Sequence, residues 1–220
     1  MQSHASPASA LPVTAAILAG GAATRMGGVV KALLEVGGRT ILDILVETLA
    51  GTLSGRFAEV LLVAKEPEAF LPMQASAPWR LVLDASQARS SLTGIHTALT
   101  YARTEHVFVT ACDTPLLRPR LLTALLEHLR PEHDVVLPIK PDGYFEPLCA
   151  IYSRRCLPHI EAQLGQEDYK IIRFFEQVRV SPLPVAALLE SDPGLVSFRN
   201  ANTAEDLALL RQTAARLAGQ

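Results

Sequence analysis

The sequence has few of the features that mark secreted, membrane or nucleic-acid-binding proteins. Its 220 residues include three cysteines, Cys112, Cys149 and Cys156, and no Cys-x-x-Cys pair. An odd, scattered set of this kind is typical of reduced thiols and predicts a cytoplasmic location. No apolar segment approaches the roughly 20 residues that a membrane-spanning helix needs, so we expect no membrane association. Residues 1–12 lack the cationic start and apolar segment of a signal peptide, and we expect them to form a loose tail.

The charge balance and the histidine spacing exclude further classes. The 20 Lys and Arg residues against 22 Asp and Glu residues leave a net charge of −2, with both signs spread along the chain. This balance excludes the extended basic surface of a nucleic-acid-binding protein. The six histidines show no metal-ligand spacing. With 49% hydrophobic residues the chain can build a globular core, and we expect one domain over residues 13–220.

Apolar segments that predict buried strands alternate with segments of helical periodicity. Such alternation predicts an α/β protein with a single doubly wound, mostly parallel sheet and helices on both faces. The predicted strands are Val13–Leu18, Glu59–Ala64, Arg80–Leu83, Val107–Cys112, Asp134–Pro138 and Leu148–Tyr152, with short extended segments at Val178–Pro182 and Leu195–Arg199. The predicted helices are Thr40–Leu49, Thr93–Arg103, Pro119–Arg130, Leu157–Leu164, Tyr169–Gln177 and Thr203–Leu217.

A glycine-rich segment follows the first predicted strand. The apolar residues Val13–Ala19 lead into Gly20 and Gly21, and Arg25 and Lys31 follow at short distances. Glycines allow a backbone to approach a ligand closely, and backbone N–H groups with two cations can bind phosphate. The spacing differs from the Walker A loop and from the Gly-x-Gly-x-x-Gly dinucleotide fingerprint. The segment therefore predicts a nucleotide-phosphate site of another type, against the alternative of a plain strand-to-helix turn.

Two aspartates directly follow predicted strands. Asp113 follows Val107–Cys112, and Asp84 follows Arg80–Leu83. In open α/β sheets, ligands bind at the carboxyl ends of the strands. Mg²⁺ is usually held by one or two carboxylates together with substrate phosphates, so Asp113 is a candidate Mg²⁺ ligand. The alternative is a structural role, because Thr114-Pro115 also predicts a turn.

Two asparagines precede the last predicted helix. Asn200 and Asn202 occupy alternate positions of a segment predicted to be extended, so they are expected to face the same way. Thr203 and Asp206 then form a variant of the helix capping box. The segment is therefore either a binding element or a capping turn that closes the domain.

Taken together, these motifs resemble those of a known family. Leu18–Gly21, followed by Arg25–Gly27 and Lys31, resembles the signature of nucleotidyltransferases that activate sugars or cofactors with a nucleoside triphosphate. Within that superfamily the sequence is most similar to the molybdenum cofactor guanylyltransferases, and Cys112–Pro115 and Asn200–Leu207 match two further motifs of that family. The resemblance implies a Rossmann-like nucleotidyltransferase fold. It also implies transfer of GMP from GTP to the phosphate of molybdenum-loaded molybdopterin, with release of pyrophosphate.

The resemblance also implies roles for particular residues. Arg25, Lys31 and Asp113 would be catalytic, Asp113 would hold Mg²⁺, and Asn200 and Asn202 would bind molybdopterin. The GTP-binding residues would be Leu18, Ala19, Gly20, Gly21, Lys31, Asp84 and Asp113. GTP and molybdopterin would be the substrates, with transient contacts to molybdenum-insertion and molybdoenzyme-maturation proteins.

The sequence departs from the family pattern at three places. Ser90-Ser91 stand where the family usually has Gly-Pro, Lys65 where it has an asparagine, and Val30 where it has an aspartate. A serine-rich segment is common in a related family that uses CTP, so a molybdopterin cytidylyltransferase is an alternative. A sugar-phosphate nucleotidyltransferase is another, and a non-catalytic adaptor that binds nucleotide and cofactor is an alternative of a different class.

Overall fold

A computed structural model describes residues 11–20, 22–23, 29–52, 57–189, 192 and 194–219 of the chain. The loose tail predicted at residues 1–12 therefore falls almost wholly outside the described residues, as do Gly21 and Arg25. The strands are β1 (Val13–Leu18), β2 (Ala22–Ala23), β3 (Val29–Val30), β4 (Glu35–Val36), β5 (Arg39–Thr40), β6 (Phe57–Ala64), β7 (Arg80–Leu83), β8 (His106–Ala111), β9 (Val135–Ile139), β10 (Cys149–Ser153) and β11 (Val180–Pro184). The helices are α1 (Ile41–Gly51), α2 (Ser91–Tyr101), α3 (Pro119–His128), α4 (Leu157–Leu164) and α5 (Ala204–Ala218).

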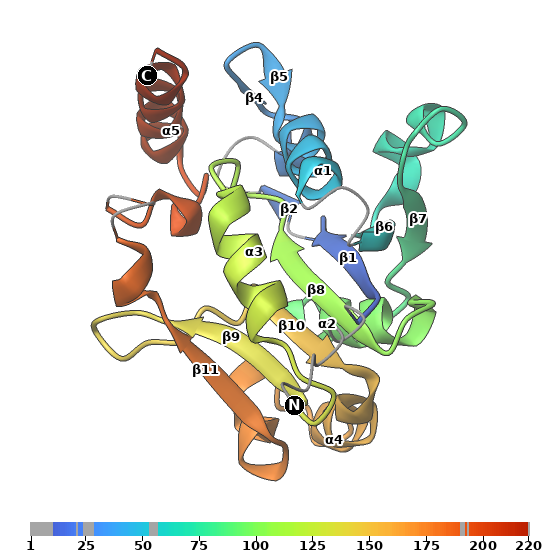
Figure 1. Cartoon of the computed structure of the whole chain (residues 1–220). Coiled ribbons are helices and arrows are strands. Elements are labelled where there is room, and N and C mark those ends of the chain that lie inside the picture. Colours follow the sequence, from blue (N-terminus) through green and yellow to red (C-terminus); the bar gives the residue numbers. More distant parts are fainter. Residues whose placement is uncertain are drawn as a thin grey trace, which may run out of the picture.

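The main sheet has the order β11-β9-β10-β8-β1-β6-β7 in the described part of the chain (Figure 1). β1 pairs in parallel with both β6 and β8, and β7 and β11 are also parallel to their neighbours. β10 is antiparallel to β8 and to β9. The prediction of a mostly parallel sheet is therefore confirmed. Because the chain leaves β1 toward β6 and later returns to β8 on the other side, the strand order reverses at β1.

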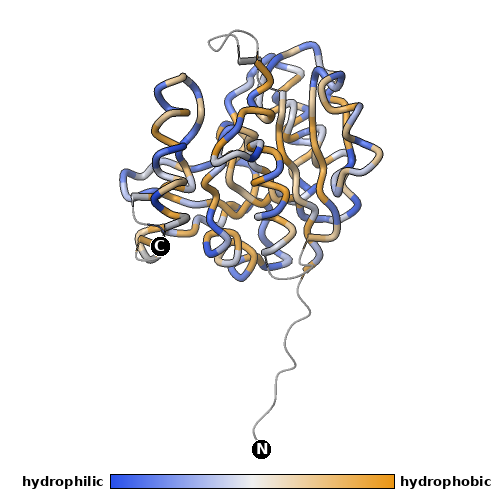
Figure 2. Tube along the Cα trace, turned by 90° about the horizontal axis from the view of Figure 1, so that it is seen from above, coloured by the Kyte–Doolittle hydropathy of each residue, from blue (hydrophilic) through white to orange (hydrophobic). Residues whose placement is uncertain are grey.

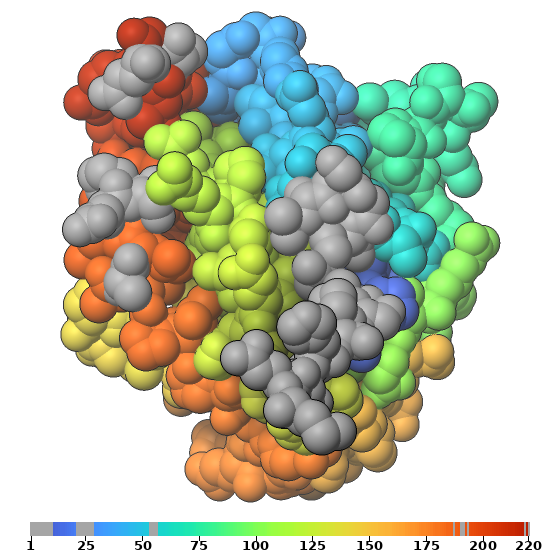
Figure 3. Space-filling model, viewed as in Figure 1, coloured from blue at the N-terminus to red at the C-terminus, as the bar shows by residue number. Residues whose placement is uncertain are grey.

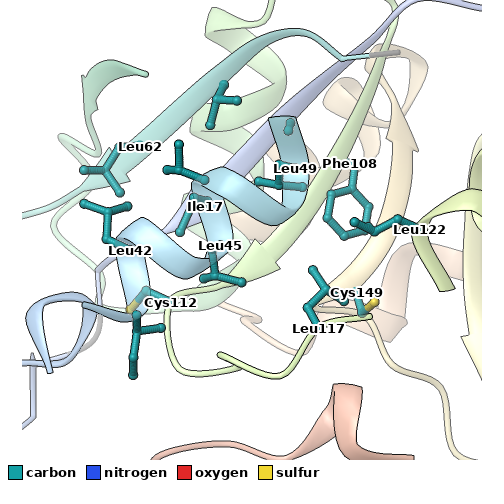
Figure 4. Close-up of a cluster of buried hydrophobic side chains, with 14 of the residues drawn as sticks. Ile17, Leu42, Leu45, Leu49, Leu62, Phe108, Cys112, Leu117, Leu122 and Cys149 are labelled. Carbon is teal, nitrogen blue, oxygen red and sulfur yellow. The ribbon is translucent and has the colours of Figure 1, made fainter. Parts of the chain in front are cut away.

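Side chains of the central strand alternate between two hydrophobic clusters. Ala15 and Ile17 of β1 belong to the cluster covered by α1 and α3, whereas Ala16 and Leu18 belong to the cluster covered by α2 and α4. All six residues of β1 are buried, as expected for a strand with helices on both faces. Figure 4 shows side chains of α1 lying among those of Ile17 and Leu62. α1 and α3 cover the face of the sheet that is seen in Figure 3.

Hydrophobic residues follow the strands, and hydrophilic residues lie mainly on the outer turns and helices (Figure 2). This pattern is typical of a sheet that forms the centre of the molecule. Within the described residues, no helix combines the length and the apolar character that crossing a membrane requires.

Helix starts follow the expected capping chemistry. The Thr40 side chain accepts a hydrogen bond from the Asp43 N–H, and Ser90 accepts one from the Thr93 N–H. Thr203 and Asp206 form the predicted capping box at the start of α5. Pro119 stands in the first turn of α3, where its missing N–H leaves no bond unmade.

One local prediction was wrong, and one predicted helix is of a different type. The segment predicted as extended at Leu195–Arg199 instead contains a 3₁₀ turn at Val196–Phe198. This turn forms because the buried carboxylate of Asp192 accepts hydrogen bonds from the backbone N–H groups of Val196 and Ser197. The helix predicted at Tyr169–Gln177 is a 3₁₀ helix over Ile171–Gln177, which buries Phe174 and Phe175 against the α2 face of the sheet.

Candidate active site

The carboxyl ends of four adjacent strands are fixed to one another by hydrogen bonds beyond the strands themselves. Ala19 N–H donates to Val63 O at 2.7 Å, Cys112 N–H to Leu18 O at 3.1 Å, and Asp84 N–H to Ala64 O at 2.8 Å. These bonds place Asp84 and Asp113 on either side of the end of β1. This is the edge where the strand order reverses, which is where open α/β sheets bind ligands.

A cavity of about 410 Å³ opens at this edge. One end is formed by residues around Lys31 and Asp113, and the other by the loop after β7 and the first turn of α2. It is lined by Leu18, Gly20, Lys31, Val63, Asp84, Arg89, Ser90, Ser91, Gly94, Ala111, Cys112, Asp113 and Leu148. Leu18, Gly20, Lys31, Asp84 and Asp113 were predicted from the sequence. Ala19 does not line the cavity, and its backbone instead bonds to β6.

The Lys31 ammonium group contacts both Asp113, predicted to hold Mg²⁺, and Asn202, predicted to bind molybdopterin. Its Nζ atom donates to Asn202 Oδ1 at 2.7 Å and to Asp113 Oδ2 at 3.3 Å. The side chains of Lys31 and Asp113 are 14% and 16% exposed, so the pair is mostly shielded from water. The Ala201 N–H donates to the backbone oxygen of Asp113 at 2.8 Å, which fixes the segment before α5 beside this carboxylate.

One oxygen of Asp113 has no partner among the residues that the structure describes. Its Oδ1 atom is buried and accepts no hydrogen bond in the described structure. A buried carboxylate oxygen without a partner is costly, and such an atom in a cavity is a candidate ligand for a cation. The described residues contain no cluster of three or more His, Cys, Asp or Glu side chains that could hold a metal by themselves. A metal ion at Asp113 would therefore share its coordination with substrate oxygens, as is usual for Mg²⁺.

Cys112 lies next to Asp113 but is not a nucleophile. Burial, together with the negative charge of Asp113, raises the pKa of its thiol to about 12. Figure 4 shows its side chain with the hydrophobic residues below α1. Cys112 therefore acts as a packed apolar residue.

A second cavity of about 170 Å³ lies on the other side of Asp113. Thr110, Ala111, Asp113, Thr114, Leu117, Glu146, Pro147, Leu148, Cys149, Ile171, Ser197, Phe198 and Asn200 line it. Ala111, Asp113 and Leu148 thus border both cavities. Asn200 lines this cavity, whereas Asn202 accepts a hydrogen bond from Lys31, which lines the first cavity. The prediction that the two asparagines face the same way stays a prediction.

The comparisons with known proteins agree with this arrangement. The family model of the MobA-like NTP transferase domain matches residues 15–180. The chain belongs to this family. It is 39% identical over 195 residues to a molybdenum cofactor guanylyltransferase of Desulfosudis oleivorans, covering 89% of this chain and 92% of the relative. It is 34% identical over 203 residues to a probable molybdenum cofactor guanylyltransferase of Natranaerobius thermophilus, covering 91% and 95%.

The fold comparison points to the same family. The crystal structure of molybdopterin-guanine dinucleotide biosynthesis protein A from Archaeoglobus fulgidus superposes with a TM-score of 0.74 at 26% identity. The match covers 94% of this chain and 100% of that chain. The chain is therefore an enzyme of the nucleotidyltransferase class, as its sequence predicted, and it has the predicted nucleotidyltransferase fold.

Two residues of this site, Glu146 and Gly94, were not assigned a role from the sequence. Glu146, which lines the second cavity, forms an ion pair with Lys140 at 2.8 Å. Gly94 lies within α2, where a Cβ atom would come within 3.2 Å of Leu18 Cδ1. Its missing side chain therefore lets α2 approach the end of β1. A glycine in the interior of an otherwise regular helix was the available signal.

Proposed function

We propose that the protein transfers GMP from GTP to the phosphate of molybdenum-loaded molybdopterin, forming the guanine dinucleotide cofactor and pyrophosphate. The observation that carries the proposal is the position of Asp113 between two cavities. Lys31 is bonded to one of its oxygens, and the other oxygen has no partner within the described part of the chain. One cavity is large enough for a nucleotide and the other borders the same carboxylate, as a transfer between two phosphates requires. The names of the relatives support the choice of GTP and molybdopterin.

On the nucleotide side, the backbone after β1 and the Lys31 ammonium group would bind the triphosphate. Gly20 lines the cavity without a side chain, and Lys31 stands at its phosphate end. Lys31 would exchange its contact with Asp113 for phosphate oxygens, where an ammonium group makes charge-assisted hydrogen bonds. Arg25 and Gly21, which lie outside the described residues, are assigned to the same triphosphate by the sequence motif alone.

The free oxygen of Asp113 fits a magnesium ion. The carboxylate is acceptor-only, is partly shielded, borders both cavities and has a cation beside it. A bound Mg²⁺ would compensate negative charge on the α-phosphate and on the departing pyrophosphate. Asp113 itself would hold the metal, and Asn202 would keep Lys31 within reach of the triphosphate.

On the acceptor side, the second cavity would hold the end of molybdopterin that carries its phosphate. Asn200 lies at this cavity and would orient the phosphate toward Asp113. The acceptor phosphate is already an anionic nucleophile, so its oxygen attacks the α-phosphorus and the bond to the pyrophosphate breaks. The protein therefore aligns two substrates and compensates charge, and it needs no covalent intermediate.

Release of pyrophosphate with molybdopterin and each nucleotide tests the proposal. With Mg²⁺ present we expect turnover with GTP and a smaller kcat/KM with CTP. Ser90 and Ser91 line the nucleotide cavity, and this observation favours CTP as the second candidate. Preference for CTP would replace guanylyl transfer by cytidylyl transfer, and a sugar phosphate as the better acceptor would replace molybdopterin. Tight nucleotide binding without turnover on any acceptor would indicate an adaptor.

The proposal includes a cellular context. The scattered reduced cysteines support a cytoplasmic location, where molybdenum-insertion and molybdoenzyme-maturation proteins would make transient contact with the enzyme. We expect no binding of nucleic acid or membranes, since the net charge is −2 and both signs are mixed. Residues 13–220 are proposed to act as one domain.

A further inference from the structure

Asp84 borders the nucleotide cavity, but its oxygens are occupied by groups of the protein itself. Oδ1 accepts from the Ser86 N–H at 3.1 Å and from the Thr97 hydroxyl at 3.4 Å. Oδ2 lies 2.9 Å from the Thr93 hydroxyl and 3.4 Å from Lys65 Nζ. A carboxylate accepts about four hydrogen bonds, so these contacts use its capacity. The side chain is 4% exposed, which leaves almost no surface for a ligand.

Lys65 is the cation of this network. Its Nζ atom donates to the backbone oxygen of Ser86 at 2.7 Å and forms the ion pair with Asp84, and its side chain is 9% exposed. A Cβ atom on Gly20 would meet Lys65 Cγ at 3.7 Å, so the lysine stem packs behind the glycine that lines the cavity. Lys65 itself is not among the residues that line the cavity. Any effect of Lys65 on a ligand would therefore be transmitted by the cavity-lining residues that it contacts.

The Lys65–Asp84 network joins three segments that lie apart in the sequence. Lys65 follows β6, Asp84 and Ser86 follow β7, and Thr93 and Thr97 stand on one face of α2. The cavity-lining residues Arg89, Ser90 and Ser91 belong to the stretch between Ser86 and Thr93. Their positions are thus set at both ends by bonds to one buried ion pair. The two charges depend on each other, because a buried lysine or aspartate without its partner destabilises the folded protein.

We propose that Lys65 is a positioning residue that sets the shape of the nucleoside end of the cavity, and with it the choice between GTP and CTP. Lys65 acts through Asp84 and the Ser86 carbonyl, which place the residue 86–91 segment against the base. The inference rests on the proposed function, because it concerns the nucleotide of that reaction.

The test compares Lys65→Met with a matched ion-pair variant in the full-length protein. Lys65→Met keeps the apolar stem and removes the charge, whereas Arg80→Met breaks the Arg80–Glu59 pair across the same two strands, at their other end. Arg80 also donates to a backbone oxygen, that of Tyr101, which makes the two variants comparable. The measurements are Kd for GTP and for CTP by calorimetry, KM for molybdopterin, kcat and the melting temperature.

For Lys65→Met we expect Kd for GTP to rise about tenfold or more, the size of effect seen when groups that orient a ligand-binding residue are removed. The ratio of the CTP and GTP dissociation constants should move toward one, with KM for molybdopterin unchanged. Arg80→Met should lower the melting temperature without changing this ratio. The double variant Lys65→Met/Asp84→Asn should regain melting temperature, since no unpaired charge remains, and should keep the altered ratio because Ser86 still lacks its donor.

Two results would overturn the inference. One is a folded Lys65→Met variant whose two dissociation constants match those of the wild type. The other is a change that Arg80→Met reproduces in full, since loss of stability alone would then explain it. Failure of the proposed function has a different signature, because the wild-type protein would then not turn over GTP with molybdopterin. In that case the ratio of nucleotide dissociation constants in Lys65→Met still decides the role of Lys65.

Discussion

Asp113 and Asp134 lie at opposite ends of the same sheet, and their oxygens have very different partners. Asp113 follows β8 at the carboxyl edge, where one oxygen contacts Lys31 and the other has no partner from the described segments. Asp134 precedes β9 at the amino edge. Its Oδ1 accepts from Arg155 Nε at 2.7 Å, and its Oδ2 accepts from the Arg179 N–H at 2.9 Å and from Arg179 Nε at 3.3 Å.

Contacts of this kind hold the charged side chains around Asp134 at the amino edge. Although burial alone would raise the pKa of Asp134, the hydrogen bonds from Arg179 and Arg155 hold it below its ordinary value. Thr104 bonds to Thr14 there, and Ser153 bonds to Glu105. The carboxyl edge instead has two cavities that meet at Asp113. A carboxylate whose partners all come from the chain supports the fold, whereas one with a free buried oxygen at a cavity is available to a ligand.

The Asp113→Asn variant is the strongest test of this difference between Asp113 and Asp134. We expect a loss of activity of about a thousandfold or more, because a metal-bound charge contributes several kcal/mol to such a reaction. The melting temperature should change little, since asparagine fits the same turn and the backbone bond from Ala201 remains. Mg²⁺-dependent pyrophosphate release and thermal melting of the same preparation check both statements. An active variant, or one that melts far below the wild type, would make Asp113 a structural residue like Asp134.

Lys31→Ala should give the next largest effect. Loss of a charge-assisted hydrogen bond costs about 1.5–3 kcal/mol, which corresponds to roughly a ten- to hundredfold fall in kcat/KM for GTP. Asn202 would lose its partner at the same time, so Asn202→Ala should give a smaller change in the same direction. Steady-state kinetics with GTP varied at saturating molybdopterin measure the effect. Wild-type kinetics in the folded Lys31→Ala protein would show that this lysine only neutralises Asp113.

The sequence predicted the sheet and its edge better than it predicted the contacts at that edge. Strands such as β1 and β7 have continuous apolar or strand-forming residues, and their predicted ranges Val13–Leu18 and Arg80–Leu83 match the structure. The aspartates that follow strands were then placed at the carboxyl edge by topology alone. This part depends on short-range pattern and on the rules of parallel sheets, which one sequence carries.

The partners of these side chains could not be predicted, because they come from distant segments. Asp84 is bonded by Thr93 and Thr97 of α2 and by Lys65, and nothing in the local pattern distinguishes it from Asp113. The turn at Val196–Phe198 was missed for the same reason: the buried carboxylate of Asp192 holds it. Packing between distant elements decides which aspartate has its oxygens bonded by the protein and which does not. This difference therefore becomes visible only in the folded chain.

The Asp134→Ala variant should lower stability without lowering activity, and so show that the amino edge acts independently of the site. We expect the free energy of unfolding to fall by about 1–3 kcal/mol, because hydrogen bonds to a charged group are lost and the Arg179 N–H loses its acceptor. Activity per folded molecule should stay near that of the wild type. Chemical denaturation and pyrophosphate release measure the two quantities, with Asp142→Ala in an exposed turn as the control. A selective loss of activity in folded Asp134→Ala would show that this edge is coupled to the site.

Acidification should give the smallest effect, and it should originate at the amino edge through His106. This side chain is 3% exposed, and burial lowers the pKa of its imidazole despite a hydrogen bond to the backbone of His133. Below the ordinary histidine value of about 6.5 the unfolded chain takes up a proton that the folded protein resists, so stability falls as the pH falls. One such group changes the free energy of unfolding by at most about 1.4 kcal/mol per pH unit.

The measurement is the melting temperature of the wild type and of His106→Phe between neutral pH and the mildly acidic range. The variant should lose less stability on acidification, and His159→Gln, which replaces a partly exposed histidine bonded to Gln177, should follow the wild type. Burial also lowers the pKa of His128, so part of the dependence should remain in His106→Phe. If the melting temperature of that variant depends on pH as in the wild type, a group other than His106 causes the acid sensitivity. The pH dependence of turnover would then have to be compared with that of melting before the carboxyl edge could be treated as independent of the amino edge.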